Sequence, residues 1–196
     1  EAIEELIGFQ SETNIPIAAF YSGHTSVNYL AELTADPVVA VRLETVQMIA
    51  EFMTSIADRY DHKTRIAPYM LNAVNDSAKA VSGIAMDALA LCGQEYEKEN
   101  QDEIIERRQY GVDGDRRANP GALPEPFSDR PRLGTRLYVR GCTRRFLKPL
   151  IAELTNWLSK TRVQSVRLLR TCIVYCEESL TQVHLSPPSR SAHHPP

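Results

Sequence analysis

The sequence predicts an all-α fold, an α-solenoid of stacked antiparallel helical hairpins with one long disordered loop. The stretch 36–53 recurs in altered form forty residues later, and each matched position keeps its apolar or small class. The same frame returns after three periods, where Arg42 falls on Arg162. A period of about forty residues is typical of helix pairs that stack as repeats.

Length and composition fit such an array. A chain of 196 residues has room for about four to five helical hairpins of ~40 residues each. Its 43% hydrophobic and 24% charged content is typical of a folded soluble protein. The net charge of −3 gives no general attraction to nucleic acid or anionic membranes, and no apolar run is long enough to span a bilayer. We therefore expect a cytoplasmic protein without a nucleic-acid or membrane partner.

Residues 1–97 predict a partial helix followed by two hairpins. Glu1 to Gln10 has a helical apolar pattern, so the chain is expected to begin inside an array. A helix is expected from Asn14 to about Leu33. The next should start at Asp36-Pro37, because Asp accepts hydrogen bonds from free amides while Pro is tolerated in a first turn. The turn of the second hairpin is expected at residues 75–77.

The rest of the chain predicts a loop, a third hairpin and a tail. Residues 98–131 are rich in charge and proline and should form an exposed loop. Residues 132–183 resume the helical pattern, with a last helix from Arg162 to about Gln182. Residues 184–196 are rich in Pro, Ser and His, cannot bury a face and should be disordered. The repeat pattern fails there, so we expect the chain to end before its array does.

A set of repeat positions is expected to hold the hairpins in place. An arginine just after a turn can reach the carbonyls of that turn or an acidic residue of the next repeat, which would form a ladder between units. Ser82 should break this ladder in the middle repeat. The expected structural residues are Asp36, Pro37, Val41, Arg42, Asp76, Val81 and Arg162.

A run of basic residues at intervals of four is the candidate partner-binding face. Its members are Arg132, Arg136, Arg140, Arg144 and Lys148. On a helix they share one slowly drifting face that could bind an acidic protein segment. The competing interpretation is a solvated face, paired with the acidic residues between Glu95 and Glu106.

No motif in the chain predicts catalysis. Walker, dinucleotide, metalloprotease and nucleophile-elbow patterns are absent, so we expect neither an enzyme nor a small-molecule substrate. Cys172 and Cys176 lie one helical turn apart, but two thiolates do not complete a tetrahedral site, and free cysteine is commonly a small buried hydrophobe. No metal or other cofactor is expected.

The turn and core spacing around Asp36-Pro37 and Val41-Arg42 resembles the HEAT repeat. Further stretches resemble the HEAT-repeat assembly factors of axonemal dynein. They are Tyr96 to Asn100, Arg130 to Gly134, Arg144 to Phe146 with Leu150, and Trp157 with Thr161 to Ser165. The resemblance spans about residues 36 to 185 and is lost from His184 onward.

That resemblance implies a non-catalytic scaffold for cytoplasmic preassembly of dynein arms. Its implied partners are dynein intermediate or heavy chains and chaperone-linked assembly factors. The alternative is a generic HEAT adaptor that binds an acidic protein in transport, phosphatase or translation machinery. Which subunit is bound, and whether the basic residues take part, is left open by the sequence.

Overall fold

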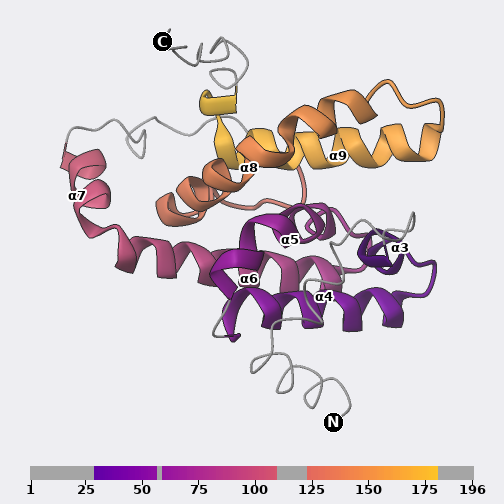
Figure 1. The fold of residues 1–196 in the computed structure, drawn as a ribbon, viewed down its shortest axis with the longest axis horizontal. Coiled ribbons are helices and arrows are strands. Elements are labelled where there is room, and N and C mark those ends of the chain that lie inside the picture. Colours follow the sequence, from indigo (N-terminus) through magenta and orange to yellow (C-terminus); the bar gives the residue numbers. More distant parts are fainter. Residues whose placement is uncertain (1–28, 57–58, 110–122, 181–196) are drawn as a thin grey trace, which may run out of the picture.

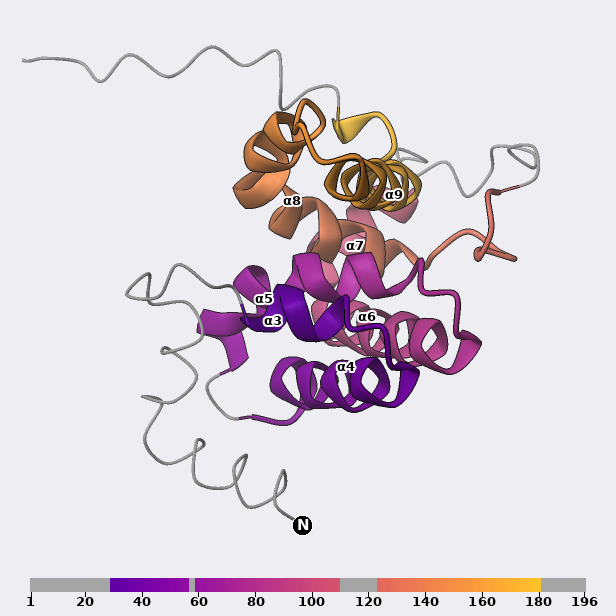
Figure 2. The same ribbon diagram turned by 90° about the vertical axis from the view of Figure 1, so that its right-hand side faces the viewer.

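A computed structural model describes residues 29–56, 59–109 and 123–180. Every regular element in these ranges is an α-helix. Helices α4 (Val39–Thr54) and α6 (Lys79–Glu99) lie side by side, and α3 (Tyr29–Thr34) and α5 (Arg59–Ala73) form a second layer against them (Figures 1 and 2). The predicted all-α solenoid is confirmed.

The first two hairpins, α3–α4 and α5–α6, follow from their sequence pattern. In α4 the apolar residues at steps of three and four become the buried stripe, which includes Val46, Ile49 and Met53. In α6 small residues allow close approach by α4, α5 and α8, as expected for a helix packed on several sides. One continuous hydrophobic core results, with members from every helix except α7.

The third hairpin joins the stack in a turned orientation. Its helices are α8 (Leu133–Glu153) and α9 (Ser159–Cys176), and Figure 2 shows them on the far side of α5 from α4. α8, rather than α9, packs against α6, while α9 packs against α5 and α8. In the forty-residue frame α9 corresponds to α4, the second helix of the first hairpin, which packs against α6. The sequence therefore places α9 beside α6, but in the structure α8 packs there instead.

A pair of glycines allows α8 to cross α6 closely. A methyl group on Gly93 would lie 2.1 Å from the Thr135 hydroxyl oxygen, and one on Gly134 would lie 2.2 Å from the Gly93 carbonyl oxygen. The Gly134 N–H, in the first turn of α8, donates to the Glu97 carboxylate at 3.0 Å. The close crossing therefore depends on a glycine in each helix and on the Glu97 side chain of α6, whose carboxylate lies at the N-terminus of α8.

The predicted exposed loop 98–131 is wrong in part. α6 continues to Glu99, and Gln101–Gln109 form α7, because Ile104 packs on Leu133 and Leu137 while Glu103 pairs with Arg107 one turn later. Near the end of the loop Phe127 is buried, with its ring edge-on to Tyr175 at 5.5 Å. Residues 110–122 lie outside the described ranges.

Two predicted helix boundaries also differ. The last helix was expected to reach Gln182, but α9 ends at Cys176, where Glu177 takes a positive φ of 50°. This conformation breaks the helical hydrogen-bond pattern. Of the helix expected over 14–33, the structure describes α3 alone. The expected helix 1–10 and the tail 184–196 lie outside the described residues.

Candidate partner-binding surface

Each second helix of a hairpin begins after an acidic or amide side chain. The Asp36 carboxylate accepts a hydrogen bond from the Val38 N–H at 2.7 Å, and Asp76 does the same for Ala78 at 2.8 Å. Asn156 repeats the bond before α9, accepting from Leu158 at 2.9 Å. In all three turns the acceptor satisfies an N–H two residues further on.

The predicted ladder between repeats forms at Arg42. One end of its guanidinium, Nη1, donates to the carbonyl oxygens of Asp36 and Pro37 at 2.7 and 3.3 Å. Its Nε and Nη2 donate to the two oxygens of the Asp76 carboxylate at 2.6 and 3.0 Å. Arg42 thus ties its own turn to the next one through a two-pronged ion pair, the strongest geometry for this pair of groups.

This ion pair shifts the proton affinity of Asp76. Partial burial alone would raise the pKa of the carboxyl, but the hydrogen bonds from Arg42 and from the Ala78 N–H outweigh it and hold the pKa below the ordinary value of 3.8. The same hydrogen bond raises the pKa of Arg42. Both groups are therefore charged at neutral pH, and the pair stays intact.

The other ladder positions behave in two ways. Ser82 donates to the Val74 carbonyl at 2.8 Å and reaches no neighbouring repeat, as its short side chain predicts. Arg162 repeats half of the Arg42 arrangement, because its Nη1 donates to the carbonyl oxygens of Asn156 and Trp157 at 2.7 and 3.0 Å. Val41 is half-buried and Val81 is fully buried in the core.

The five basic residues, Arg132 just before α8 and the other four on it, do not form one exposed stripe. Arg136 is 0% exposed and donates to the Pro131 carbonyl and to Glu177. Arg140 also pairs with Glu177, and Arg132 pairs with Glu97 at 2.9 Å. The expectation of a common binding face is therefore wrong at Arg136, since the long loop and the end of α9 cover that position. The expected pairing with the acidic run is met at Glu97.

Sequence reasoning missed Glu177, which gathers three arginines. Its carboxylate accepts from Arg130 at 2.6 Å, from Arg136 at 3.2 Å and from Arg140 at 3.1 Å. It thereby joins the end of the loop, the start of α8 and the end of α9. The run of arginines hinted at an acidic partner, but nothing in the sequence pointed to this residue.

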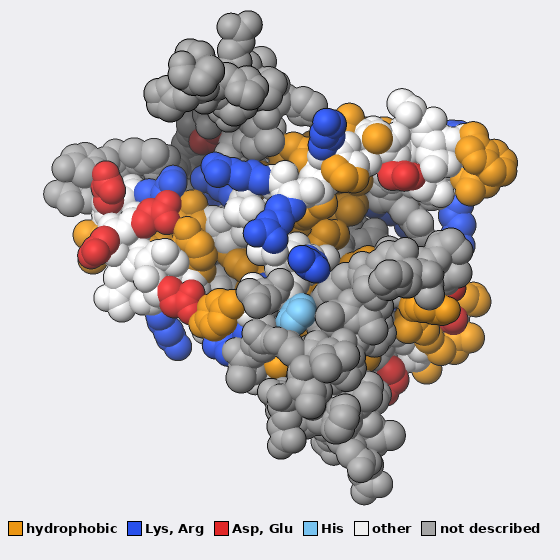
Figure 3. All heavy atoms as spheres, viewed as in Figure 1, with side chains coloured by type: hydrophobic (Ala, Val, Ile, Leu, Met, Phe, Trp, Pro, Cys, Tyr) orange, Lys and Arg blue, Asp and Glu red, His pale blue; other side chains and the backbone are white. Residues whose placement is uncertain are grey.

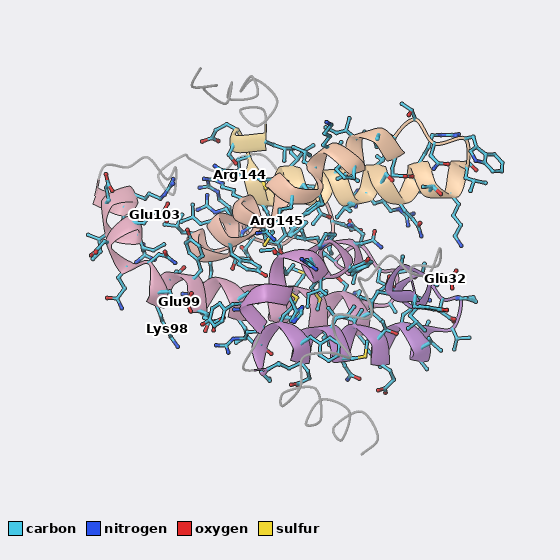
Figure 4. All side chains as sticks on the ribbon, viewed as in Figure 1. Glu32, Lys98, Glu99, Glu103, Arg144 and Arg145 are labelled. Atoms are coloured by element: carbon cyan, nitrogen blue, oxygen red, sulfur yellow. The ribbon has the colours of Figure 1, made fainter. Side chains whose placement is uncertain are left out.

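The remaining cations of the set are open to solvent. Arg144 and Lys148 are exposed on α8, and Arg145 beside them is exposed and donates to the Thr64 hydroxyl at 3.0 Å. In the space-filling view, Lys and Arg side chains gather over α8 (Figure 3), and Arg144 and Arg145 project from its middle (Figure 4). The accessible basic surface is thus centred on the second half of α8.

A second cluster that sequence reasoning missed ties α5 to α6. Glu95 accepts from both Arg59 and Lys63, although Lys63 is only 6% exposed. Burial alone would raise the pKa of Glu95, but these two cations together lower it. These ion pairs hold the two helices of the second hairpin together.

The described residues contain no group of three or more side chains that could together hold a metal ion. Cys92, Cys142, Cys172 and Cys176 are free and buried, and burial raises the pKa of the Cys92 thiol to about 11. Such thiols stay protonated and behave as small apolar groups. Within the same ranges no helix is long and apolar enough to cross a membrane.

Stacked hairpins, capped turns and an arginine ladder define a helical-repeat protein of the HEAT type. Residues 17–107 match the family model described as "Dynein axonemal assembly factor 5-like, TPR repeats", and residues 123–187 match "Dynein axonemal assembly factor 5, HEAT-repeat domain". The chain belongs to the HEAT-repeat family of axonemal dynein assembly factors.

Individual relatives agree with this assignment. The chain is 25% identical over 166 residues to dynein axonemal assembly factor 5 of Xenopus laevis. The aligned region covers 83% of this chain and 19% of that relative. The Homo sapiens protein of the same name is 26% identical over 156 residues, or 80% of this chain and 18% of the relative. The chain thus spans about a fifth of the length of the relatives it matches. No solved structure matches it at a significant level.

Proposed function

We propose that this chain is a non-catalytic, protein-binding scaffold that acts in the cytoplasmic preassembly of axonemal dynein arms. The observation that carries the proposal is the pair of family matches, which together follow the hairpins on both sides of the long loop. The relatives in four animal species are named as axonemal dynein assembly factors. The partners would be dynein intermediate or heavy chains and chaperone-linked assembly factors.

The character of the surface supports a binding role over catalysis. Two hollows among the described residues are open to solvent and are lined by the interhelical turns and by residues of α3, α4, α5 and α9. Their polar groups include Arg42 and Asp76, which are already paired with each other. A stack of helices of this kind offers an extended surface to a protein partner.

Within this function, the exposed cations of α8 are the face that would receive an acidic partner segment. Arg144 and Lys148 have no acidic partner among the described residues, unlike Arg132, Arg136 and Arg140. Cations on a rigid helix, free of local carboxylates, can pair with a partner's Asp and Glu side chains. The same face would serve a generic adaptor for an acidic protein, so the identity of the captured protein separates the two functions.

Co-precipitation from ciliating cells tests both the proposed role in dynein assembly and the proposed binding face on α8. The full chain should recover dynein intermediate or heavy chains or chaperone-linked factors. A variant with Arg144→Glu and Lys148→Glu should recover them several-fold less, because two attractive contacts become repulsive. The matched control carries Lys79→Glu and Lys98→Glu, which make the same charge change on exposed positions of α6.

The outcomes are separable. Failure of the unmodified chain to recover any dynein or chaperone component would overturn the proposed function. Equal recovery by the α8 variant and the α6 control would leave the function standing and remove α8 as the binding face. Recovery of an unrelated acidic protein alone would favour the generic adaptor.

A further inference from the structure

The turned third hairpin leaves a groove between itself and the first two hairpins. Two hollows of about 270 and 180 Å³ lie between the first half of α9 on one side and α3, α5 and the first two interhelical turns on the other. Both hollows are lined by Thr34, Ala35, Asn72 and Gln164, so they are two ends of one groove. Figure 1 shows α9 on the side of the molecule where α3 and α5 lie.

The walls of this groove are held in place by contacts near its polar end. Asn75, in the turn before α6, donates to the Thr171 hydroxyl oxygen at 2.6 Å and accepts from Arg170 at 3.0 Å, which fixes α9 to the second hairpin. The ion pair of Arg42 with Asp76 joins the turns of the first two hairpins at the same end. A groove with fixed walls has little conformational entropy to lose when a ligand binds.

An amide side chain on each wall lacks a hydrogen-bond partner. Asn72 on α5 and Gln164 on α9 are half-buried, line both hollows, and their side chains bond to no other group of the chain. Each amide offers an acceptor oxygen and two donor hydrogens, which are the groups that pair with a peptide bond. An extended segment has unpaired backbone N–H and C=O groups, so two such amides across a groove suit its main chain.

The polar end of the groove has one cation to offer a ligand. Arg167 is exposed and pairs with no described carboxylate. The carboxylates at this end are engaged, because Asp76 is paired with Arg42, and Asp36 accepts the Val38 N–H. The wall behind Arg167 is basic, since α9 contains four basic residues and no acidic one. This end therefore favours an acidic side chain.

The other end of the groove is mainly apolar. It is lined by Ala31, Pro68, Tyr69 and Leu168. A ligand that places a large apolar side chain here removes apolar surface from water, which is favourable. The groove as a whole thus matches a segment with one acidic and one apolar side chain.

We propose that this groove binds an extended segment of a partner protein that carries an acidic and a large apolar residue. Asn72 and Gln164 pair with the backbone of the segment, and Arg167 receives its carboxylate. The apolar side chain lies between α5 and α9. None of the exposed cations of α8 lines the groove, so it is a second contact surface, and it does not depend on which protein α8 receives.

NMR of the purified, isotope-labelled full chain tests the proposal. The probes are short synthetic peptides of Ser and Gly with blocked ends, each with one Glu and one Leu at varied spacing. At least one of them should shift the side-chain NH2 signals of Asn72 and Gln164, because these groups form new hydrogen bonds. Replacing its Glu by Lys should weaken binding about tenfold or more, and replacing its Leu by Ser should weaken binding by a similar factor.

Matched variants of the chain locate the contact. Arg167→Glu should weaken peptide binding about tenfold or more, because an attraction becomes a repulsion. Gln164→Ala should weaken it several-fold through the loss of one amide. Lys160→Glu makes the same charge change on an exposed position of α9 that lines neither hollow, and it should bind like the unmodified chain. Circular dichroism and thermal unfolding identify any variant that fails to fold.

The results separate this groove from the α8 surface. If no peptide shifts the two NH2 signals, or if Arg167→Glu and Lys160→Glu have equal effects, the proposal is overturned. Loss of binding with Arg144→Glu and Lys148→Glu, but not with Arg167→Glu, would place the acidic peptide on α8 and also overturn it. The assay contains no dynein component, so its outcome is independent of the co-precipitation from cells.

Discussion

At the scale of single residues, the contact between Arg42 and Asp76 is the link between the first two hairpins, and Asp76→Asn isolates it. The amide oxygen can still accept the Ala78 N–H, so only the pair with Arg42 is lost. We expect a decrease of ~1–3 kcal/mol in the free energy of unfolding in urea at neutral pH. Asp87→Asn, an exposed change on the same helix, is the control and should have little effect.

The pH dependence of that difference has a defined sign. The folded-state pKa of Asp76 lies below its ordinary value of 3.8, so the carboxylate contributes full stability above that pH. The contribution is lost as the pH falls through the folded-state pKa. The gap between the unmodified chain and Asp76→Asn should therefore close in acid, and a gap that persisted there would argue against the ion pair as its cause.

Residues were predictable from the sequence where the repeat fixes their neighbours. Arg42 and Asp76 stand at set positions in successive repeats, so their contact followed from the period. Glu177 meets Arg130, Arg136 and Arg140, which lie 37 to 47 residues away. That cluster depends on how the third hairpin turns, and no local pattern carries this information.

At the scale of helices, the close crossing of α6 and α8 predicts that one added methyl group at Gly93 lowers the stability of the fold. In Gly93→Ala the new methyl would lie 2.1 Å from the Thr135 hydroxyl oxygen and 2.4 Å from the Thr135 backbone nitrogen. The helices would have to separate, which should lower the free energy of unfolding by ~1–3 kcal/mol.

The same helix provides an opposite control. Gly83 has nothing within 4 Å of the position a methyl would take. Gly83→Ala should therefore stabilise α6 by ~0.5–1 kcal/mol through helix propensity alone. Urea unfolding of both variants gives the comparison, and a Gly93→Ala chain as stable as Gly83→Ala would mean that the crossing is not tightly packed.

Helices were predictable where apolar periodicity and turn residues agree, as in α4, α5 and α6. α7 was missed because nine residues dominated by charge resemble a loop until Ile104 finds Leu133 and Leu137 on α8. The turned third hairpin was missed for a related reason. The repeat frame gives the order of helices along the chain, while the glycine contact between α6 and α8 decides which of them pack together.

At the scale of the whole molecule, one hydrophobic core joins α3, α4, α5 and α6 to α8 and α9, on the two sides of the long connection between α7 and α8. The two family matches, 17–107 and 123–187, divide at that connection. A shared core predicts that the parts unfold together, because separation would expose α6 to water along the face that α8 covers.

Buried cysteines in both parts allow this to be measured. Cys92 lies in α6 and is 2% exposed, and Cys172 lies in α9 and is 0% exposed. Burial raises the pKa of both thiols, so each should react with a thiol reagent only after unfolding. The reaction of both cysteines can be followed by peptide mass spectrometry across a urea series. We expect them to become reactive at the same urea midpoint, and this midpoint should coincide with the loss of the helical circular dichroism signal. If Cys172 reacted at a lower urea concentration than Cys92, the third hairpin would be a separate unit that detaches before the first two unfold.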